Sequence, residues 1–83
     1  MNMKKELAIK QIREDFINKV MLSENEIDVL ERYIKKHSIV KIAEDTRQGT
    51  ATVSRIIAEI KLKYEDYKEL EIAKLMLLTN KKQ

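Results

Sequence analysis

The chain has 83 residues, of which 43% are hydrophobic, and it contains no cysteine and a single histidine. This size and composition are typical of one small folded domain, taken here as residues 1–83. They exclude a disulfide, a thiolate metal site and an ordinary histidine-based zinc site. His37 is therefore expected to have a structural role at the end of a helix.

No arrangement of catalytic residues is visible in the sequence. It has no Ser-His-acid set, no glycine-rich phosphate loop and no metal cluster, so we expect no enzymatic activity and no cofactor. The net charge of +3 is unevenly distributed, because residues 47–64 carry four basic residues and one acidic residue. Clustered positive charge is a feature of surfaces that bind polyanions, and it is equally compatible with a solvated helix face.

Proline is absent and Gly49 is the only glycine. Because these are the two strongest helix breakers, we predict an all-α fold of about five helices, with Gly49 marking the tightest turn. No segment is apolar for long enough to cross a membrane, and no secretory signal follows the N-terminal lysines. We expect a cytoplasmic protein without a membrane partner.

Helical periodicity predicts a first helix from about Lys4 to Val20, within an N-terminal segment 1–21. Its buried face is predicted to consist of Ile9, Ile12, Phe16 and Val20, with Leu7, Ile17 and Met21 outside it. Ser23 and Glu26 form a capping-box pattern, so a second helix is expected from Glu24 to about Lys36. Its predicted buried residues are Ile27, Leu30 and Ile34.

Two further helices around a tight turn predict a helix-turn-helix at 38–63, inside a core segment 22–64. The third helix follows Ser38 and is predicted to bury Ile39, Ile42 and Ala43. The break spans 46–49, and the fourth helix opens at Thr50, taken as its N-cap. This helix is predicted to bury Val53, Ile56, Ile57 and Ile60, with Tyr64 nearby. Ala43 is small enough for a close helix crossing with Val53, ten residues later.

The opposite face of the fourth helix carries small residues and one arginine. At about 100° per residue, Ala51, Arg55 and Ala58 point away from the buried face. Small side chains let a helix lie deep in the major groove, hydroxyls bind base edges or phosphates, and arginine binds guanine or phosphate. The candidate DNA-binding residues are Arg47, Gln48, Thr50, Ala51, Ser54, Arg55 and Lys61, with Ala58 further along.

The motif Leu22-Ser23-x-x-Glu26-x-x-Val29-Leu30, followed by Ile42-Ala43-Glu44 and Thr52-Val53, resembles the four-helix domain of the LuxR/GerE regulators. It is also similar to region four of sigma factors, and the run from Gly49 to Arg55 resembles the recognition helix of the Trp repressor group. The resemblance covers roughly Leu22 to Leu78 and implies a DNA-binding regulator, commonly dimeric, with the second helix of the unit in the major groove.

The turn departs from the pattern of these families. Arg47 stands where they usually have glycine, and Thr46 stands where they usually have leucine. A non-glycine residue in the left-handed conformation costs about 1 kcal/mol. Either Arg47 adopts the left-handed conformation and bears that strain, or the chain bends two residues later, at Gly49.

The last helix, expected from about Asp66 to Thr79 in segment 65–80, is apolar on two sides. Leu70, Ala73 and Leu77 share one face, and Ile72, Leu75 and Met76 lie on the other. Leu62 also points outward. We predict a homodimer interface with Leu70, Ile72, Leu75 and Met76 as its residues. The alternative is that the first helix covers the second face within the same chain.

These observations predict a sequence-specific, dimeric transcription regulator whose partner is double-stranded DNA. The main alternative is a helical protein-interaction module or a viral or plasmid accessory protein with the same fold, such as an adaptor for RNA polymerase or a packaging or replication subunit. Salt dependence and sequence dependence of DNA binding distinguish the two.

Overall fold

The computed structural model describes residues 3–80, with side chains described as far as Leu77. These residues form five helices: α1 (Met3–Leu7), α2 (Lys10–Val20), α3 (Glu24–Ile34), α4 (Ile39–Thr46) and α5 (Thr50–Asn80). No strand occurs among them. The predicted all-α class with about five helices is confirmed, although four of the five predicted helices have different boundaries.

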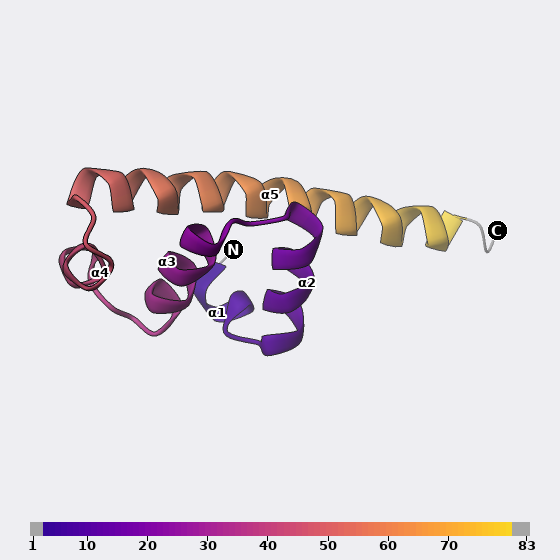
Figure 1. The fold of residues 1–83 in the computed structure, drawn as a ribbon. Coiled ribbons are helices and arrows are strands. Elements are labelled where there is room, and N and C mark those ends of the chain that lie inside the picture. The colour runs from indigo at the N-terminus through magenta and orange to yellow at the C-terminus, as the bar shows by residue number, and fades with distance from the viewer. Residues whose placement is uncertain (1–2, 81–83) are drawn as a thin grey trace.

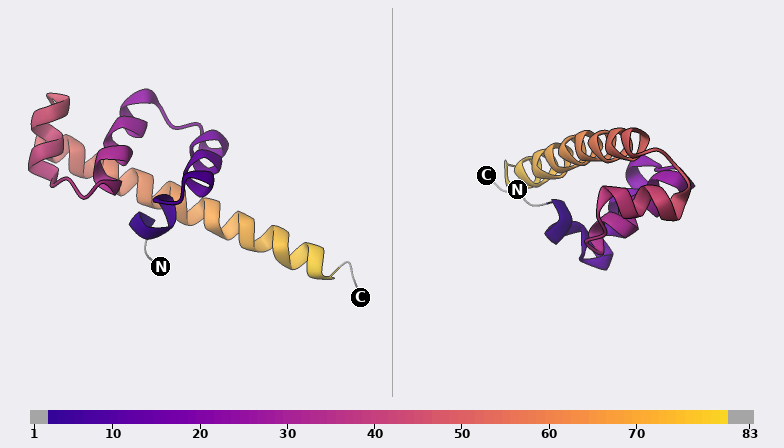
Figure 2. Two further views of the ribbon diagram at one scale, coloured as in Figure 1. Left: turned by 90° about the horizontal axis from the view of Figure 1, so that it is seen from below. Right: turned by 90° about the vertical axis from the view of Figure 1, so that its left-hand side faces the viewer.

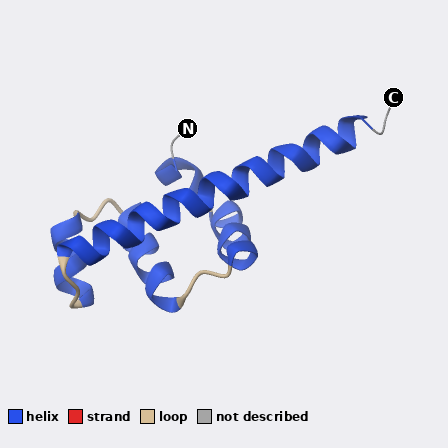
Figure 3. Cartoon of the chain, turned by 90° about the horizontal axis from the view of Figure 1, so that it is seen from above, coloured by secondary structure: helices blue, strands red, loops and turns tan. Residues whose placement is uncertain are grey.

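One long helix organises the molecule. The four shorter helices lie along one side of α5, and the C-terminal part of α5 projects beyond them (Figure 1). The view along α5 in Figure 2 shows the other helices gathered to one side of its axis. The resulting shape is elongated, with principal extents of 54 × 20 × 18 Å. One flank of α5 is therefore left without a covering helix along the described chain (Figure 3).

The predicted first helix is two helices. The chain leaves the helical conformation at Ala8 and Ile9, and Ile9 becomes the N-cap residue of α2 with an extended backbone. In an uninterrupted helix Leu7 and Phe16 would point about 180° apart. The break brings both into one core, where each is fully buried, and leaves Ile9 52% exposed. The predicted burial of Ile9 and exclusion of Leu7 were therefore wrong.

The predicted fourth and last helices are one helix. The buried positions of α5 continue past Tyr64 to Tyr67 at helical spacing, so the core-facing stripe does not change direction near residue 65. No glycine or proline interrupts the segment. Tyr67, which is buried, was not among the residues predicted for the stripe.

Serine caps set the starts of α3 and α4. Ser23 forms the predicted capping box: its Oγ accepts from the Glu26 backbone N–H, while Glu26 Oε1 accepts from the Ser23 backbone N–H at 2.9 Å. At α4 there is a single cap bond, in which the Ser38 Oγ accepts from the Lys41 backbone N–H. The second predicted helix ends at Ile34 and not at Lys36, because Lys36 adopts a left-handed conformation with φ of 70°.

Two apolar clusters form the core. The first joins α1, α2, α3 and α5 and consists of Leu7, Phe16, Leu22, Leu30, Ile60, Tyr64 and Tyr67. The second joins α3, α4 and α5 and consists of Val29, Ile42, Ala43, Val53 and Ile57. Ile56 packs against both clusters and links them. Ile39 was predicted to be buried but is 36% exposed.

Candidate nucleic-acid interface

The crossing of α4 and α5 has the packing that a helix-turn-helix requires. Ala43 and Val53 are buried in the same cluster together with Ile42 and Ile57. A small residue on α4 and a β-branched residue on α5 let the two backbones approach closely. The predicted pairing of Ala43 with the apolar face of the following helix is confirmed.

The turn between these helices bends at Arg47. This residue adopts the left-handed conformation, with φ of 57° and ψ of 43°, and the backbone N–H of Gln48 donates to the Ala43 carbonyl at 2.9 Å. Gly49 has no positive φ. The expectation that Gly49 marks the tightest turn was therefore wrong, and the strain lies at Arg47.

Gly49 has a different role, as the residue before the first turn of α5. Its carbonyl accepts from the Val53 backbone N–H at 3.0 Å, and Thr50 is the first helical residue. Thr50 had been predicted to be the N-cap. Thr50 is instead part of the helix, and its side chain is exposed at the start of α5.

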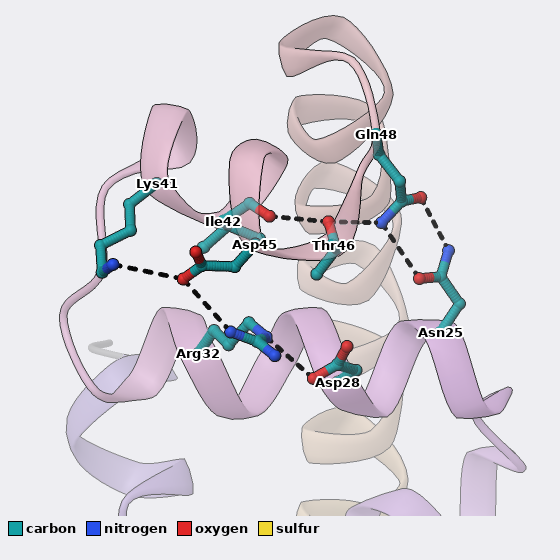
Figure 4. Close-up of polar contacts among 8 residues, drawn as sticks. All are labelled: Asn25, Asp28, Arg32, Lys41, Ile42, Asp45, Thr46 and Gln48. Atoms are coloured by element: carbon teal, nitrogen blue, oxygen red, sulfur yellow. Dashed lines mark hydrogen bonds and ion pairs between the residues drawn. The ribbon is translucent and has the colours of Figure 1, made fainter.

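Side-chain amides attach the turn to α3. Asn25 and Gln48 exchange two hydrogen bonds, at 3.0 and 3.1 Å, and the Gln48 amide also donates to Thr46 Oγ1 at 2.9 Å (Figure 4). The Thr46 hydroxyl donates to the Ile42 carbonyl at 2.7 Å. The Gln48 amide group is thus engaged within the chain. Asn25 was missed by the sequence analysis, because a contact across 23 residues leaves no local pattern, and Thr46 was noted only as a departure from the family pattern.

An arginine links α3 to α4 beside these amides. Arg32 pairs with Asp28 at 2.9 Å on its own helix and with Asp45 of α4 at 3.3 Å (Figure 4). Lys41 pairs with the same Asp45 carboxylate at 3.3 Å. These contacts hold α4 against α3, and so they position the turn and the start of α5.

The outward face at the start of α5 is built from exposed small and basic residues. Thr50, Ala51, Ser54, Arg55 and Ala58 are all exposed, as is Arg47 in the turn. Within residues 3–80, no acidic side chain pairs with Arg47 or Arg55. By contrast, Lys63 pairs with Glu26 at 2.8 Å and Lys68 pairs with Glu6 at 3.0 Å. The two guanidinium groups beside the turn remain available for an external anion.

Lys61 lies apart from this group. It is about 120° around the helix from Arg55. Its Nζ lies 5.8 Å from the ring centroid of Tyr33, and Lys4 lies 4.1 Å from the same ring. The structure therefore gathers Arg47, Thr50, Ala51, Ser54 and Arg55 at one end of α5, and it places Lys61 on the flank that faces the end of α3.

Tyrosine and carboxylate pairs fix the middle of α5 to the N-terminal helices. The Tyr64 hydroxyl donates to Glu6, and the Tyr67 hydroxyl donates to Asp15 at 2.5 Å. These hydrogen bonds lower the pKa of both carboxyl groups, while burial raises the pKa of Tyr67 to about 12. Phe16 packs edge-on against both tyrosine rings. The sequence analysis identified neither pair.

From Ile72 to Leu77 the side chains of α5 are exposed. The proposed interface residues Leu70, Ile72, Leu75 and Met76 are 63%, 47%, 64% and 61% exposed, and Leu77 is 62% exposed. Neither apolar side of this segment is covered by another described part of the chain. The alternative that the first helix covers one side was therefore wrong. Leu62 is exposed as predicted.

Comparison with known proteins assigns the chain to no family. No family model matches the chain, and neither a curated protein nor a solved structure matches it significantly. In the described residues, no three His, Cys, Asp or Glu side chains are grouped to hold a metal ion. None of the helices described combines the length and apolar character needed to span a membrane.

Proposed function

We propose that this protein is a dimeric, sequence-specific DNA-binding regulator that inserts the start of α5 into the major groove. The observation that carries the proposal is the exposed face of Thr50, Ala51, Ser54 and Arg55, flanked by Arg47, with both arginines lacking an acidic partner in residues 3–80. The cytoplasm is its proposed location.

In this proposal each residue of the face is assigned one contact. Arg55 makes a bidentate contact with a guanine edge, and Ser54 and Thr50 bind a base edge or a phosphate. Ala51 and Ala58 allow close approach and present methyl groups to thymine. Arg47 binds a phosphate at the edge of the groove. Gln48 supports the turn through Asn25 and is no longer proposed as a base contact.

Two copies are part of the proposal. One short recognition helix reads few base pairs, whereas a two-fold pair reads two related half-sites. The exposed apolar residues of α5 from Leu70 to Leu77 supply the surface through which two copies associate.

The test begins with selection of bound duplexes from a random pool, followed by titration of the selected duplex. Arg55→Ala should weaken binding by about 5- to 150-fold, equivalent to about 1–3 kcal/mol for a lost bidentate contact. Arg55→Lys keeps the positive charge but loses the two parallel N–H donors of the guanidinium. It should therefore reduce the preference for guanine at one base pair. Arg47→Ala should weaken binding to all duplexes alike. It should also reduce the slope of log affinity against log salt concentration by about 1, as expected for one lost phosphate contact.

Lys10→Ala is the matched control, because it removes one exposed positive charge at the start of α2, outside the proposed face. It should leave the preferred sequence and affinity nearly unchanged. If Arg55→Ala binds the selected duplex as well as Lys10→Ala does, the groove assignment is wrong. If no duplex is enriched at all, a protein-interaction module becomes the better description.

A further inference from the structure

Two lysines from distant parts of the chain meet at one tyrosine ring. Lys4 of α1 places its Nζ 4.1 Å from the ring centroid of Tyr33, and Lys61 of α5 places its Nζ 5.8 Å from the same centroid. Both distances are within the range of a cation–π contact, and the two ammonium groups are at most about 10 Å apart, the sum of the two distances. The fold thus concentrates two positive charges on the flank of α5 that faces the end of α3.

Neither of these ammonium groups has an acidic partner. Within residues 3–80 Lys4 and Lys61 form no ion pair, whereas Lys68, on the same flank of α5, pairs with Glu6 at 3.0 Å. That carboxylate also accepts a hydrogen bond from the Tyr64 hydroxyl, so it is already engaged. Two like charges held this close repel each other, and an anion bound beside them would remove the repulsion.

Tyr33 gives the two lysines a fixed support. Its side chain is half-buried and packs against the cluster that contains Ala43 and Val53, so its ring is attached to the crossing of α4 and α5. A lysine side chain loses conformational freedom when it binds a ligand. Contact with a fixed ring restricts both lysines before the ligand arrives, which lowers that cost.

The lysine pair lies in line with the candidate DNA-binding face. Lys61 follows Ser54 by seven residues, so it lies about 20° away around the axis of α5 and about 10 Å further along it. The major groove is about 12 Å wide. With the start of α5 in the groove, a group about 10 Å further along the helix reaches the edge of the groove, where the phosphates lie.

We propose that Lys4 and Lys61, supported by Tyr33, form a phosphate-binding site that holds the DNA backbone beside the groove. This inference rests on the proposed function and adds to it a contact from α1, outside the helix-turn-helix. Lysines bind phosphates irrespective of the base sequence, whereas the proposed contact of Arg55 distinguishes bases. The lysine site therefore contributes affinity for every duplex, and Arg55 contributes specificity.

The salt dependence of DNA binding tests the lysine site. The double variant Lys4→Gln with Lys61→Gln should reduce the slope of log affinity against log salt concentration by about 1–2, on the selected duplex and on an unrelated duplex alike. Each single change should give part of that reduction. Lys74→Gln is the matched control, because it removes a lysine charge from the same helix about 20 Å beyond Lys61. It should leave the slope unchanged.

Two changes at Tyr33 test its role as a support. Tyr33→Leu removes the ring but keeps both lysine charges, so it should lower the affinity for every duplex by about 2- to 10-fold, the cost of ordering one long side chain. Tyr33→Phe keeps the ring and should retain the affinity. Equal affinities for Tyr33→Leu and Tyr33→Phe, with melts showing both variants folded, would overturn this role.

The outcomes separate this site from the groove assignment. An unchanged slope in the double lysine variant, while Arg55→Ala still loses base preference, would overturn the lysine site alone. A reduced slope with no effect of Arg55→Ala would support the lysine site and overturn the groove assignment. Loss of binding to vesicles of phosphatidylserine and phosphatidylcholine in the double variant, with binding to every duplex unchanged, would overturn DNA as the ligand of the site.

Discussion

At the scale of single residues, the turn before α5 combines a strained backbone with an unpaired charge. Arg47 holds a left-handed conformation that glycine adopts without a steric penalty, and its side chain is exposed. Gly49, two residues later, needs no such freedom, since a Cβ there would meet only Thr52 Oγ1 at 3.9 Å. A residue kept in an unfavourable conformation is consistent with a role for its side chain.

Stability and DNA affinity should therefore change in opposite directions at this position. Arg47→Gly should raise the free energy of unfolding by up to about 1 kcal/mol, because the left-handed strain is removed. For a chain of this size that corresponds to an increase in Tm of about 4–8 °C. The same change should weaken DNA binding. Circular dichroism melts and DNA titrations measure the two effects.

Arg47→Ala separates the two effects, since it removes the guanidinium but keeps the Cβ that causes the strain. It should weaken DNA binding as Arg47→Gly does and leave the Tm close to its original value. A lower Tm for Arg47→Gly than for Arg47→Ala would show that the bend is not strained as described.

At the scale of elements, local signals were predictable and long-range ones were not. The capping box at Ser23 lies within four residues, so it was visible in the sequence. The break between α1 and α2 has no local cause such as glycine or proline, and it exists because Leu7 and Phe16 both reach the core. The amide pair of Asn25 and Gln48 likewise depends on how α4 packs on α3. The exposed face of α5 was predictable because helical periodicity alone defines it.

The attachment of α1 and α2 to α5 should depend on pH. The pKa values of Glu6 and Asp15 are lowered in the folded chain by the tyrosine hydrogen bonds, and that of Glu26 is lowered by Lys63 and the cap. Below the ordinary values of 4.5 and 3.8, the unfolded chain binds more protons than the folded one. The stabilisation is present above about pH 4.5 and is lost as the pH falls through the lowered pKa values.

We therefore expect the Tm to fall between about pH 5 and pH 3. The double variant Tyr64→Phe and Tyr67→Phe should show a lower Tm at pH 7 and a shallower fall, because its carboxyl groups lose the hydroxyl donors. Melts at a series of pH values check this expectation. Parallel curves for the two proteins would mean that the tyrosines do not shift these carboxyl groups.

At the scale of the whole molecule, the elongated shape leaves an apolar helix end that a monomer exposes to water. The packed helices occupy one part of α5, and its last turns carry large side chains that are more than half exposed, among them Leu70, Leu75 and Leu77. Burying this surface against a second copy removes apolar area from water, which favours association. The folded state of the dimer is then stabilised by mass action.

The Tm should consequently rise with protein concentration. Leu77→Glu should abolish that rise, because it introduces a charge at the proposed contact, whereas Leu62→Glu should preserve it. Both leucines are about equally exposed, so neither change disturbs the core. Melts across a hundredfold range of concentration, with sedimentation at tens of micromolar, provide the measurement. A Tm independent of concentration and a monomer in sedimentation would contradict the dimer.

Because α5 is continuous, a rotation at its C-terminal part moves the candidate DNA-binding residues at its start. Ala73 and Arg55 are 18 residues apart on one uninterrupted helix, which corresponds to about 27 Å. A change of about 10° in the direction of α5 about Ala73 would displace Arg55 by about 5 Å, more than the spacing of one base pair. Any ligand or partner that tilted α5 at Ala73 would thereby move the proposed groove-facing residues without touching them.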